Sequence, residues 1–336
     1  MVNVGIIGYG YWGPNLVRNF AQNGNCTLKR VVDKREERLQ QVSKLYPSIE
    51  TSTSSDDILT ASDIDAVVVA TPVFLHFEQA KKALENGKHV LVEKPLTSSA
   101  QEASELIEIA AKNNKTIMVD HTFLYTGAVI KIKSLIESGE IGDLQYFDSV
   151  RINLGLFQPD INVLWDLAPH DISILNHISG LKPYSVNASG VSHTPNRIEN
   201  VAYLTVNYEE DFVAHFSCSW TSPVKVRNTL IGGSKKMIVY DDVEPSEKIK
   251  VYDSGYEIQP SSDEDKRKVL IDYRIGDIHI PKLEKTEALF GMSSDFIDAI
   301  DKGSTPKVSG EDGLEVVKIL EASTESLKNN GKEVML

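Results

Sequence analysis

Short apolar segments alternate with amphipathic segments over the first third of the chain. Apolar runs of strand length occur at residues 2–7, 28–33, 66–70, 89–93 and 116–120. Between them, apolar residues recur every three to four positions, which is the period of one helix face. Short apolar strands that alternate with helices are typical of a parallel sheet covered by helices on both faces. We therefore predict an N-terminal α/β domain with a doubly wound parallel sheet.

Two of the predicted helices carry recognisable ends. Ser99 and Glu102 have the spacing of a capping box at a helix start. Gly87 follows the apolar stripe of the preceding helix and is suited to end it. A weaker unit at residues 49–59 fits between the second and third strands.

The pattern changes after about residue 122. Helical periodicity is found at residues 128–138, 165–179, 294–301 and 313–329. Alternating strand-like segments, separated by turn-like polar stretches at 207–211 and 232–235, are found at residues 201–208, 212–220, 225–231 and 237–240. Residues 241–267 are polar and suggest a loop with at most one short strand. We predict two domains, a nucleotide-binding domain at 1–121 and an α+β domain with a mostly antiparallel sheet at 122–336.

Charge and composition narrow the classes of partner. The formal net charge of the 336 residues is -13, which disfavours nucleic acid because its phosphates need a basic face. No apolar run approaches the roughly 18 residues of a membrane span, and the N-terminus does not resemble a signal peptide. The two cysteines, Cys26 and Cys218, form no Cys-x-x-Cys pair. We therefore expect a cytoplasmic protein with free thiols that binds neither nucleic acid nor membrane.

A glycine-rich turn follows the first predicted strand. Residues 8–13 read Gly-Tyr-Gly-Tyr-Trp-Gly, and Pro14 stands where a helix would begin. In this G-x-G-x-x-G pattern, Gly8 makes the tight turn, Gly10 lets the backbone approach a pyrophosphate, and Gly13 allows close helix–strand packing. A diphosphate would rest on the N–H groups at the helix N-terminus. Alone, the pattern also fits an ordinary glycine-rich turn.

An acidic residue stands where a dinucleotide site needs one. Asp33 lies 20 residues after Gly13, at the end of the second predicted strand, where a carboxylate can bind ribose hydroxyls. The combination predicts a dinucleotide cofactor. A carboxylate there repels a 2′-phosphate, so we expect NAD rather than NADP, although Lys34 and Arg35 offer groups that can accommodate that phosphate.

A lysine ends the fourth predicted strand. Lys94 lies in Glu93-Lys94-Pro95, and ligands of open α/β sheets bind at the carboxyl ends of strands. A lysine there can stabilise alkoxide character on a substrate oxygen during hydride transfer. The alternative is a surface lysine before a turn proline.

Asp166 and His170 are four residues apart and share one face of a predicted helix. Pro169 is compatible with this helix if its first turn begins near Trp165. A histidine is a natural proton acceptor near neutral pH, and Asp166 could orient it or bind a second hydroxyl. A histidine satisfied within the fold is the alternative. His177 could add a metal-binding face, but no cysteine or second carboxylate joins it at ligand spacing, so we expect no metal.

Three blocks make the chain resemble the Gfo/Idh/MocA family, named for glucose–fructose oxidoreductase, inositol dehydrogenase and a rhizopine-catabolism protein. The blocks are G-Y-G-Y-W-G at 8–13, V-E-K-P at 92–95 and W-D-L-A-P-H-D at 165–171. The resemblance covers essentially the whole chain. It implies a Rossmann domain followed by an α+β domain whose open-faced sheet often forms dimers or tetramers. It also implies a dehydrogenase that acts on CH–OH donors, with Lys94 and His170 flanking nicotinamide and substrate.

The family resemblance extends to residues 120–125 and 151–155. Residues 121–125, together with 164–171, resemble the subgroup that oxidises nucleotide-linked amino sugars of the UDP-N-acetylglucosamine type at C3. The catalytic residues expected on these grounds are Lys94, Asp166 and His170. The expected cofactor contacts are Gly8, Gly10, Tyr11, Trp12, Gly13, Asp33, Thr71, Pro72, His76, Glu93 and Lys94. The expected substrate contacts are Lys94, His121, Tyr125, Arg151, Asn153, Asp166 and His170.

A nucleotide-linked substrate needs a local basic lining on this acidic chain. Arg151, Lys225 and Arg227 are candidates, with Lys225 and Arg227 alternating on one predicted strand. They could equally be solvated strand residues. Three other functions stay open at this level: a dehydrogenase of free sugars or inositol, an NAD-binding regulator without turnover, and a metal-assisted lyase or epimerase.

Overall fold

The computed structural model describes residues 1–209, 211–258 and 271–336 and divides the chain into two compact units. Unit 1 comprises residues 1–126 and 286–321, and unit 2 comprises residues 127–285 and 322–336. This division differs from the predicted domains 1–121 and 122–336, chiefly because residues 286–321 return to unit 1. An apolar helix face shows that a helix is packed but not which sheet it covers, so the sequence could not assign this segment.

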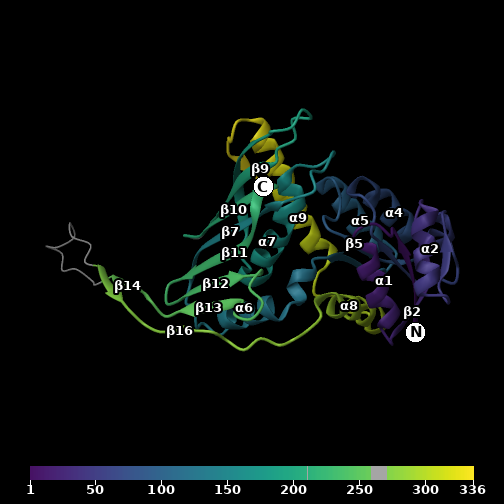
Figure 1. Ribbon diagram of the computed structural model, residues 1–336, viewed down its shortest axis with the longest axis horizontal. Coiled ribbons are helices and arrows are strands. Elements are labelled where there is room, and N and C mark those ends of the chain that lie inside the picture. Colours follow the sequence, from purple (N-terminus) through teal and green to yellow (C-terminus); the bar gives the residue numbers. More distant parts are fainter. Residues whose placement is uncertain (210, 259–270) are drawn as a thin grey trace. The chain divides into compact units, whose positions relative to one another are not determined.

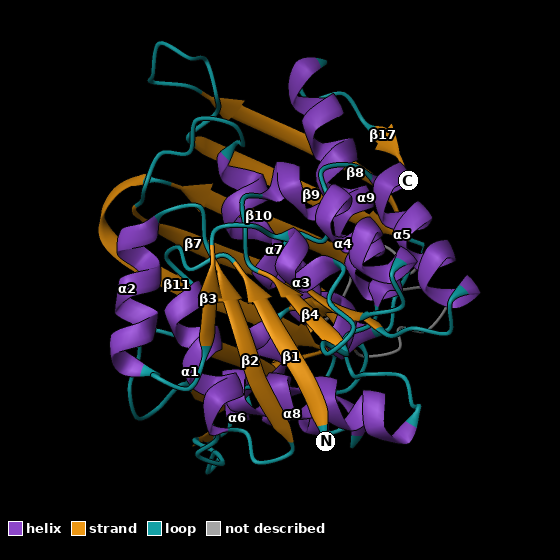
Figure 2. Ribbon diagram, turned by 90° about the vertical axis from the view of Figure 1, so that its right-hand side faces the viewer, coloured by secondary structure: helices purple, strands orange, loops and turns teal. Residues whose placement is uncertain are grey.

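Unit 1 is built on a parallel sheet. Within its described residues the six strands run in the order β3-β2-β1-β4-β5-β6, every neighbouring pair is parallel, and Figure 2 shows β3, β2, β1 and β4 side by side. The strands are β1 (Val2–Ile7), β2 (Cys26–Val32), β3 (Glu50–Ser52), β4 (Ala66–Val69), β5 (His89–Glu93) and β6 (Ile117–Asp120). All five predicted strands are confirmed. The weaker unit at 49–59 contains β3 and a single helical turn.

Helices and short 3-10 turns follow the strands of unit 1. They are α1 (Gly13–Gln22), α2 (Glu36–Leu45), α3 (Asp56–Leu59), η1 (Val73–Leu75), α4 (His76–Glu85), α5 (Ala100–Lys112), η2 (Thr122–Tyr125), α8 (Ala288–Lys302) and the first part of α9 (Gly310–Lys328). The predicted cap of α5 is present, because the Ser99 hydroxyl accepts a hydrogen bond from the Glu102 N–H. The Glu102 carboxylate accepts from Ser98 rather than Ser99, so the capping box is shifted by one residue.

Unit 2 contains a larger sheet of mostly antiparallel strands. In the described part of the chain its nine strands run in the order β16-β13-β12-β11-β7-β10-β9-β8-β17, and β7 and β10 form its one parallel pair. The strands are β7 (Leu144–Leu154), β8 (Pro183–Val191), β9 (Val201–Tyr208), β10 (Val213–Ser219), β11 (Thr221–Gly233), β12 (Met237–Asp241), β13 (Ile249–Tyr252), β16 (Ile278–His279) and β17 (Val334–Met335). A separate two-stranded ladder joins β14 (Gly255–Ile258) to β15 (Ile271–Arg274).

Helix α7 (Val163–Ser179) packs on β7, β9 and β10, and α6 (Gly127–Glu137) packs on α7 (Figure 1). On strand β9 the face toward the helices is buried and the opposite face is exposed: Leu204 and Val206 are fully buried, while Tyr203 is 47% exposed. One face of this sheet therefore carries the core of unit 2, and the helices of unit 2 leave the other face open, as the resemblance implied.

Strands β7 and β8 were not predicted from the apolar pattern. Strand β8 contains proline, asparagine and glycine, which all have low β propensity. Strand β7 carries charged and polar residues on both faces. Part of the predicted loop at 241–267 is also strand, namely β13 and β14, while its residues 259–267 lie outside the described residues.

Helix α7 begins earlier than predicted. Asn162 caps it, accepting from the N–H groups of Leu164 and Trp165, so Pro169 lies inside the helix rather than in its first turn. The expectation that Pro169 occupies a position with an unpaired N–H is therefore wrong. A proline at this place removes the hydrogen bond that the Trp165 carbonyl would otherwise accept.

None of the helices that the structure describes combines the length and the apolar character needed to cross a bilayer.

Candidate functional site

The glycine turn after β1 has the geometry of a ligand cradle. Gly8 adopts a φ of +105°, and a Cβ there would lie 2.2 Å from the carbonyl oxygen of Ala70. A Cβ on Gly13 would lie 2.5 Å from the Gly8 carbonyl oxygen. A Cβ on Gly10 would meet only the Arg35 side chain, at 3.9 Å, so this backbone is open to a ligand. The tight turn at Gly8 and the close packing at Gly13 match the roles predicted from the spacing, and the pyrophosphate contact at Gly10 stays a prediction.

Helix α1 presents an N-terminus without a side-chain cap. Trp12 occupies the cap position and makes no side-chain capping hydrogen bond, and Pro14 lies in the first turn. Tyr11 is 87% exposed, and its ring stacks on Trp12 with 6.2 Å between the ring centroids. An uncapped helix start beside an open glycine is suited to a diphosphate. The residues of unit 1 therefore fit a nicotinamide dinucleotide.

Asp33 follows β2 and is 8% exposed. Its carboxylate accepts from the Tyr9 N–H at 2.8 Å and from the Arg35 side chain at 3.0 and 3.2 Å. Burial alone would raise the pKa of Asp33, but the hydrogen bonds from Arg35 and Tyr9 outweigh it and hold the pKa below its usual value. Asp33 is therefore ionised near neutral pH, and Arg35 already neutralises part of its charge.

The turn after β4 contains the expected contacts Thr71, Pro72 and His76. The Thr71 hydroxyl donates to Gln79, and Pro72 is exposed. The two ring nitrogens of His76 lie 2.9 Å from the Pro95 carbonyl oxygen and 2.7 Å from the Thr71 carbonyl oxygen. Burial lowers the pKa of His76, and a neutral ring can donate to only one of these carbonyls. His76 thus ties the turn after β4 to the turn after β5.

Two carboxyl groups are buried at the carboxyl ends of β5 and β6. Glu93 and Asp120 are register partners on these parallel strands and are 7% and 2% exposed. Burial raises the pKa of Glu93 well above its usual range, and the neighbouring Asp120 adds to the rise. Burial also raises the pKa of Asp120, against a hydrogen bond from Thr122. Both pKa values shift in the direction that favours the protonated carboxyl, because two like groups are buried side by side.

Lys94 and His121 come directly after this carboxyl pair. Lys94 is half-buried, and its backbone N–H donates to the Glu93 carboxylate at 3.2 Å. His121 is 1% exposed, and neither ring nitrogen has a hydrogen-bond partner in the described part of the chain. Burial, with a smaller contribution from the Lys94 charge, lowers the pKa of His121 to about 3. His121 is therefore neutral near pH 7.

The Tyr125 side chain is buried within unit 1. Its hydroxyl donates to Asp295 on α8 at 2.6 Å, and the side chain is 5% exposed. Burial and the Asp295 hydrogen bond both raise the pKa of Tyr125. Its expected contact with substrate stays a prediction, and the observed contact joins η2 to α8.

In unit 2, Asp166 and His170 lie on α7, as their spacing predicts. Asp166 is half-buried and accepts a hydrogen bond from the Trp220 indole at 2.8 Å. The His170 carbonyl accepts from the Ser173 hydroxyl, a bond that does not engage the imidazole. One face of one helix thus presents a carboxylate and an imidazole, the set that an acid–base reaction needs.

Arg151 occupies a buried ion pair. Its guanidinium makes a two-bond fork to Asp171, at 2.9 and 2.6 Å, and Ser149 donates to the same carboxylate. Burial would lower the pKa of Arg151, but the charge of Asp171 raises it above its usual value. Removing one partner of such a pair costs about 3–5 kcal/mol because the other charge is left buried and unpaired, so Arg151 is required as the partner of Asp171. Its role on substrate, and that of the half-buried Asn153 on the same strand, stay predictions.

The two basic residues of β11, Lys225 and Arg227, do not follow the simple alternation of strand faces that their spacing predicts. The register of β11 shifts between Thr221 and Val226, so spacing alone does not place Lys225 on the face of Arg227. Arg227 donates to Asp242 at 3.1 Å, whereas Lys225 is exposed.

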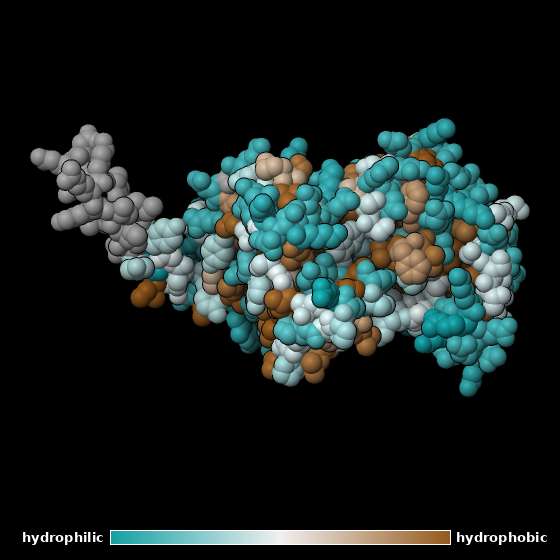
Figure 3. All heavy atoms as spheres, turned by 90° about the horizontal axis from the view of Figure 1, so that it is seen from above, coloured by the Kyte–Doolittle hydropathy of each residue, from teal (hydrophilic) through white to brown (hydrophobic). Residues whose placement is uncertain are grey.

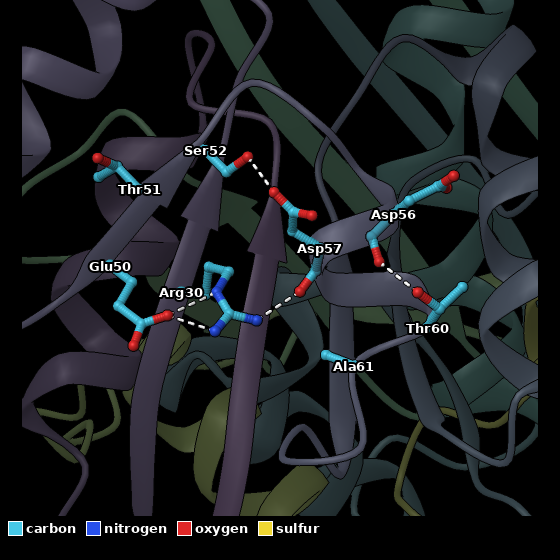
Figure 4. A pocket seen from close by; sticks show the side chains of 8 residues that line it. All are labelled: Arg30, Glu50, Thr51, Ser52, Asp56, Asp57, Thr60 and Ala61. Carbon is cyan, nitrogen blue, oxygen red and sulfur yellow. Dashed lines mark hydrogen bonds and ion pairs between the residues drawn. The ribbon is translucent and has the colours of Figure 1, made fainter.

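A hollow of about 480 Å³ lies elsewhere in unit 1, between β2, β3 and α3 (Figure 4). Arg30 spans it, bonding to Glu50 and to the Asp57 carbonyl, and Ser52 donates to the Asp57 carboxylate. Its lining contains no residue of the glycine turn and no residue after β5. We therefore assign the cofactor to the glycine turn and not to this hollow.

No group of three or more His, Cys, Asp or Glu arranged to hold a metal ion is present among residues 1–209, 211–258 and 271–336. His170 and His177 therefore have no such cluster around them in the described chain.

Three residues of these sites were not singled out from the sequence. Asp120 ends β6 as Glu93 ends β5, so the carboxyl-end argument that identified Lys94 could have found it. The sequence placed Asp171 in a predicted helix and Trp220 in a predicted strand and gave no indication of their contacts. Their contacts join segments far apart in the chain, and no spacing rule encodes them.

Sequence profiles of one protein family match both units. The profile "Oxidoreductase family, NAD-binding Rossmann fold" matches residues 2–121, and the profile "GFO/IDH/MocA C-terminal domain" matches residues 129–239.

Named relatives are similar over part or all of the chain. The scyllo-inositol 2-dehydrogenase (NADP(+)) IolW of Bacillus subtilis is 25% identical, over 100% of this chain and 96% of the relative. The UDP-N-acetylglucosamine 3-dehydrogenase of Acidithiobacillus ferrooxidans is 30% identical, over 61% of this chain and 64% of the relative. A solved structure of that enzyme, GnnA, superposes with a TM-score of 0.81 and 23% identity over 98% of each chain, which shows the same fold.

His121 makes the stability of unit 1 depend on pH. Its pKa is about 3 in the folded chain against 6.5 for an ordinary histidine, so between these values only the unfolded chain takes up the proton. The stabilising contribution is full above pH 6.5 and is lost as the pH falls toward 3. We expect the free energy of unfolding to fall by about 1.4 kcal/mol per pH unit below pH 6 on account of this one site.

Urea unfolding of the wild type and His121→Gln between pH 6 and pH 5 measures this slope. In His121→Gln the slope of the unfolding free energy against pH should be smaller by about 1.4 kcal/mol per pH unit, the contribution of one proton. His89→Gln is a matched comparison, since burial lowers the pKa of His89 to about 4 and its loss should reduce the slope similarly. An unchanged slope in His121→Gln would show that the folded chain protonates His121 normally.

Proposed function

Because the chain belongs to the Gfo/Idh/MocA oxidoreductase family, we propose that it is an NAD-dependent dehydrogenase that oxidises a ring CH–OH of a sugar, at C3 of a nucleotide-linked sugar. The observation that carries the proposal is the position of Lys94. It stands at the carboxyl end of β5, in the unit whose glycine turn and Asp33 fit the dinucleotide. Ligands of a parallel sheet bind at that edge.

Lys94 holds the substrate oxygen in this reaction. Its ammonium donates to the hydroxyl and stabilises the negative charge that grows on oxygen as the carbon loses hydride. The bound nicotinamide supplies the hydride acceptor. Near Lys94, the buried carboxyls of Glu93 and Asp120 both have raised pKa values, which disfavours two negative charges beside the Lys94 ammonium.

His170 accepts the hydroxyl proton, and Asp166 orients the imidazole or binds a second hydroxyl. The substrate thus loses a hydride from carbon and a proton from oxygen, and a ketone forms. A pure cofactor sensor would need Gly8 and Asp33 but neither Lys94 nor an acid–base pair, so the presence of both supports turnover over regulation.

The nucleotide-linked substrate is supported by the local similarity to the UDP-N-acetylglucosamine 3-dehydrogenase. Of the three basic residues expected to contact phosphate, Arg151 and Arg227 bind the carboxylates of Asp171 and Asp242. Lys225 is exposed on β11 and is therefore the candidate for a phosphate contact. A second candidate function, oxidation of free inositol, is favoured by the full-length similarity to the scyllo-inositol 2-dehydrogenase.

We also propose a homodimer or homotetramer formed through the open face of the nine-stranded sheet. That face carries exposed aromatic and aliphatic side chains, among them Tyr146 at 36%, Tyr203 at 47% and Val213 at 44%. In the view of Figure 3, apolar side chains stand among hydrophilic ones on the surface that faces the viewer. Such exposure is typical of surfaces that associate.

A cytoplasmic location is part of the same proposal. Cys26 and Cys218 are both free and buried, and burial raises the pKa of Cys26 to about 11. Thiols kept neutral in this way suit a reducing compartment, and cell fractionation would test the location.

The catalytic assignment predicts a large loss of turnover without a loss of cofactor binding. Lys94→Ala and His170→Ala should each lower kcat by about two orders of magnitude or more, the usual scale for acid–base or oxyanion contributions. Lys81→Ala on α4 and His279→Gln on β16 are matched controls and should retain full turnover. Normal turnover of His170→Ala would assign the proton to another group.

Cofactor choice should follow Asp33. We expect tighter binding of NAD than of NADP in a titration of Trp fluorescence, because the ionised Asp33 repels a 2′-phosphate. Asp33→Ala should narrow the difference, while Arg35→Ala should weaken NADP more than NAD. Equal or tighter NADP binding by the wild type would overturn the NAD assignment.

The substrate proposal predicts that a nucleotide-linked sugar is oxidised with a higher kcat/KM than the matched free sugar or inositol. Lys225→Ala should reduce that preference by raising KM for the nucleotide-linked sugar alone. A free sugar or inositol with the higher kcat/KM would remove the nucleotide-sugar claim and leave the dehydrogenase claim intact.

Association should appear as a molar mass of two or four times 37.2 kDa in light scattering. Tyr203→Asp combined with Val213→Asp should shift the protein toward the single-chain mass, because it places charge on the open face. A wild type that stays a single chain at all concentrations would contradict the proposed assembly.

A further inference from the structure

Trp220 stands at the corner between β10 and β11 and is 1% exposed. Its indole Nε1 donates a hydrogen bond to Asp166 Oδ2 at 2.8 Å. An indole has a single N–H donor, and when buried it needs an acceptor. Here the acceptor is Asp166, which the proposed function makes a catalytic residue.

The position of Trp220 is fixed on several sides. Its backbone N–H donates to the Asn200 carbonyl at 2.9 Å, and its carbonyl accepts from the Gly155 N–H at 3.0 Å. The indole lies so close to Gly155 that a Cβ there would be 2.5 Å from its Cδ1 atom. The Phe157 ring packs 5.7 Å from the Trp220 ring, centroid to centroid.

A carboxylate in the first turn of a helix has two side-chain torsions that it can rotate. A donor that is itself held by the backbone and by packing selects one of those orientations. Hydrogen bonds to an ionised acceptor are about twice as strong as neutral ones, so the selection is substantial. Trp220 is 1% exposed, and its indole N–H is used by the bond to Asp166.

We propose that Trp220 is a positioning residue of the dehydrogenase: its indole N–H holds the Asp166 carboxylate in the orientation used during catalysis. The inference rests on the proposed function, because that function takes Asp166 as a reactive group. It extends the acid–base set of α7 to a residue on the sheet. It also explains why residue 155 is glycine, since a side chain there would displace the indole.

Helix α7 offers a matched control. Trp165 precedes Asp166, and its indole Nε1 donates to the Thr324 hydroxyl, also at 2.8 Å. The two tryptophans therefore lose the same donor, at the same distance, when replaced by phenylalanine. Only one of the two bonds ends on Asp166.

The first measurement compares Trp220→Phe with Trp165→Phe. We expect Trp220→Phe to lower kcat by about ten- to a hundredfold, the scale of a misplaced catalytic group, with the Kd for NAD unchanged. Trp165→Phe should stay within about threefold of the wild type. Gly155→Ala keeps the indole but displaces it, so we expect its kcat to be lowered as in Trp220→Phe.

A double-mutant cycle separates positioning from general stability. In the Asp166→Asn background, Trp220→Phe should cost little further activity, because there is no carboxylate left to position. Multiplying losses in the double variant would show that Trp220 acts by another route and would overturn the inference. Wild-type turnover of Trp220→Phe beside an impaired Asp166→Asn would overturn it as well.

A spectroscopic measurement tests the contact without turnover. The indole ¹H–¹⁵N resonance of Trp220, assigned by its loss in Trp220→Phe, should move in Asp166→Asn while that of Trp165 stays in place. An unmoved Trp220 resonance would overturn the inference even in an active enzyme. If instead Asp166→Asn turns over normally although the resonance moves, the contact is real and the proposed function fails in its use of Asp166, which also removes the catalytic role of Trp220.

Discussion

A parallel sheet brings the carboxyl ends of all its strands to one edge, and the site of unit 1 depends on this constraint. The glycine turn follows β1, Asp33 follows β2, Lys94 follows β5 and Asp120 ends β6. Strand order then decides which of these groups are neighbours. Because β5 and β6 are adjacent and in register, Glu93 and Asp120 come together although they are 27 positions apart in the chain.

Crowding charges at a buried edge has consequences that differ between the two units. In unit 1, burial and the neighbouring carboxyl raise the pKa of Glu93, and burial lowers the pKa of His121. In unit 2 the buried Arg151 keeps its charge, because two hydrogen bonds to the Asp171 carboxylate compensate the loss of water. Burial therefore suppresses charge where like groups meet and preserves it where unlike groups meet.

Much of unit 1 could be predicted from the sequence because its signals are local. A strand, a glycine turn and an acid 20 residues later lie within one short stretch, and the structure confirms the strands. The sequence could not assign 286–321 to unit 1 or identify β7 and β8, whose polar residues hide their strand character. It also could not find the Trp220–Asp166 bond, because residues 54 positions apart meet only through the sheet and helix that carry them.

The central claim is that hydride leaves a ring carbon of a nucleotide-linked sugar. The most direct test is incubation of the enzyme with NAD and a UDP-linked N-acetyl amino sugar that carries deuterium at C3, followed by NMR of the nicotinamide. The account predicts that the reduced cofactor carries deuterium at C4 of the ring. Reduced cofactor without deuterium would contradict oxidation at C3, and no reduction with any nucleotide-linked sugar would contradict the substrate class.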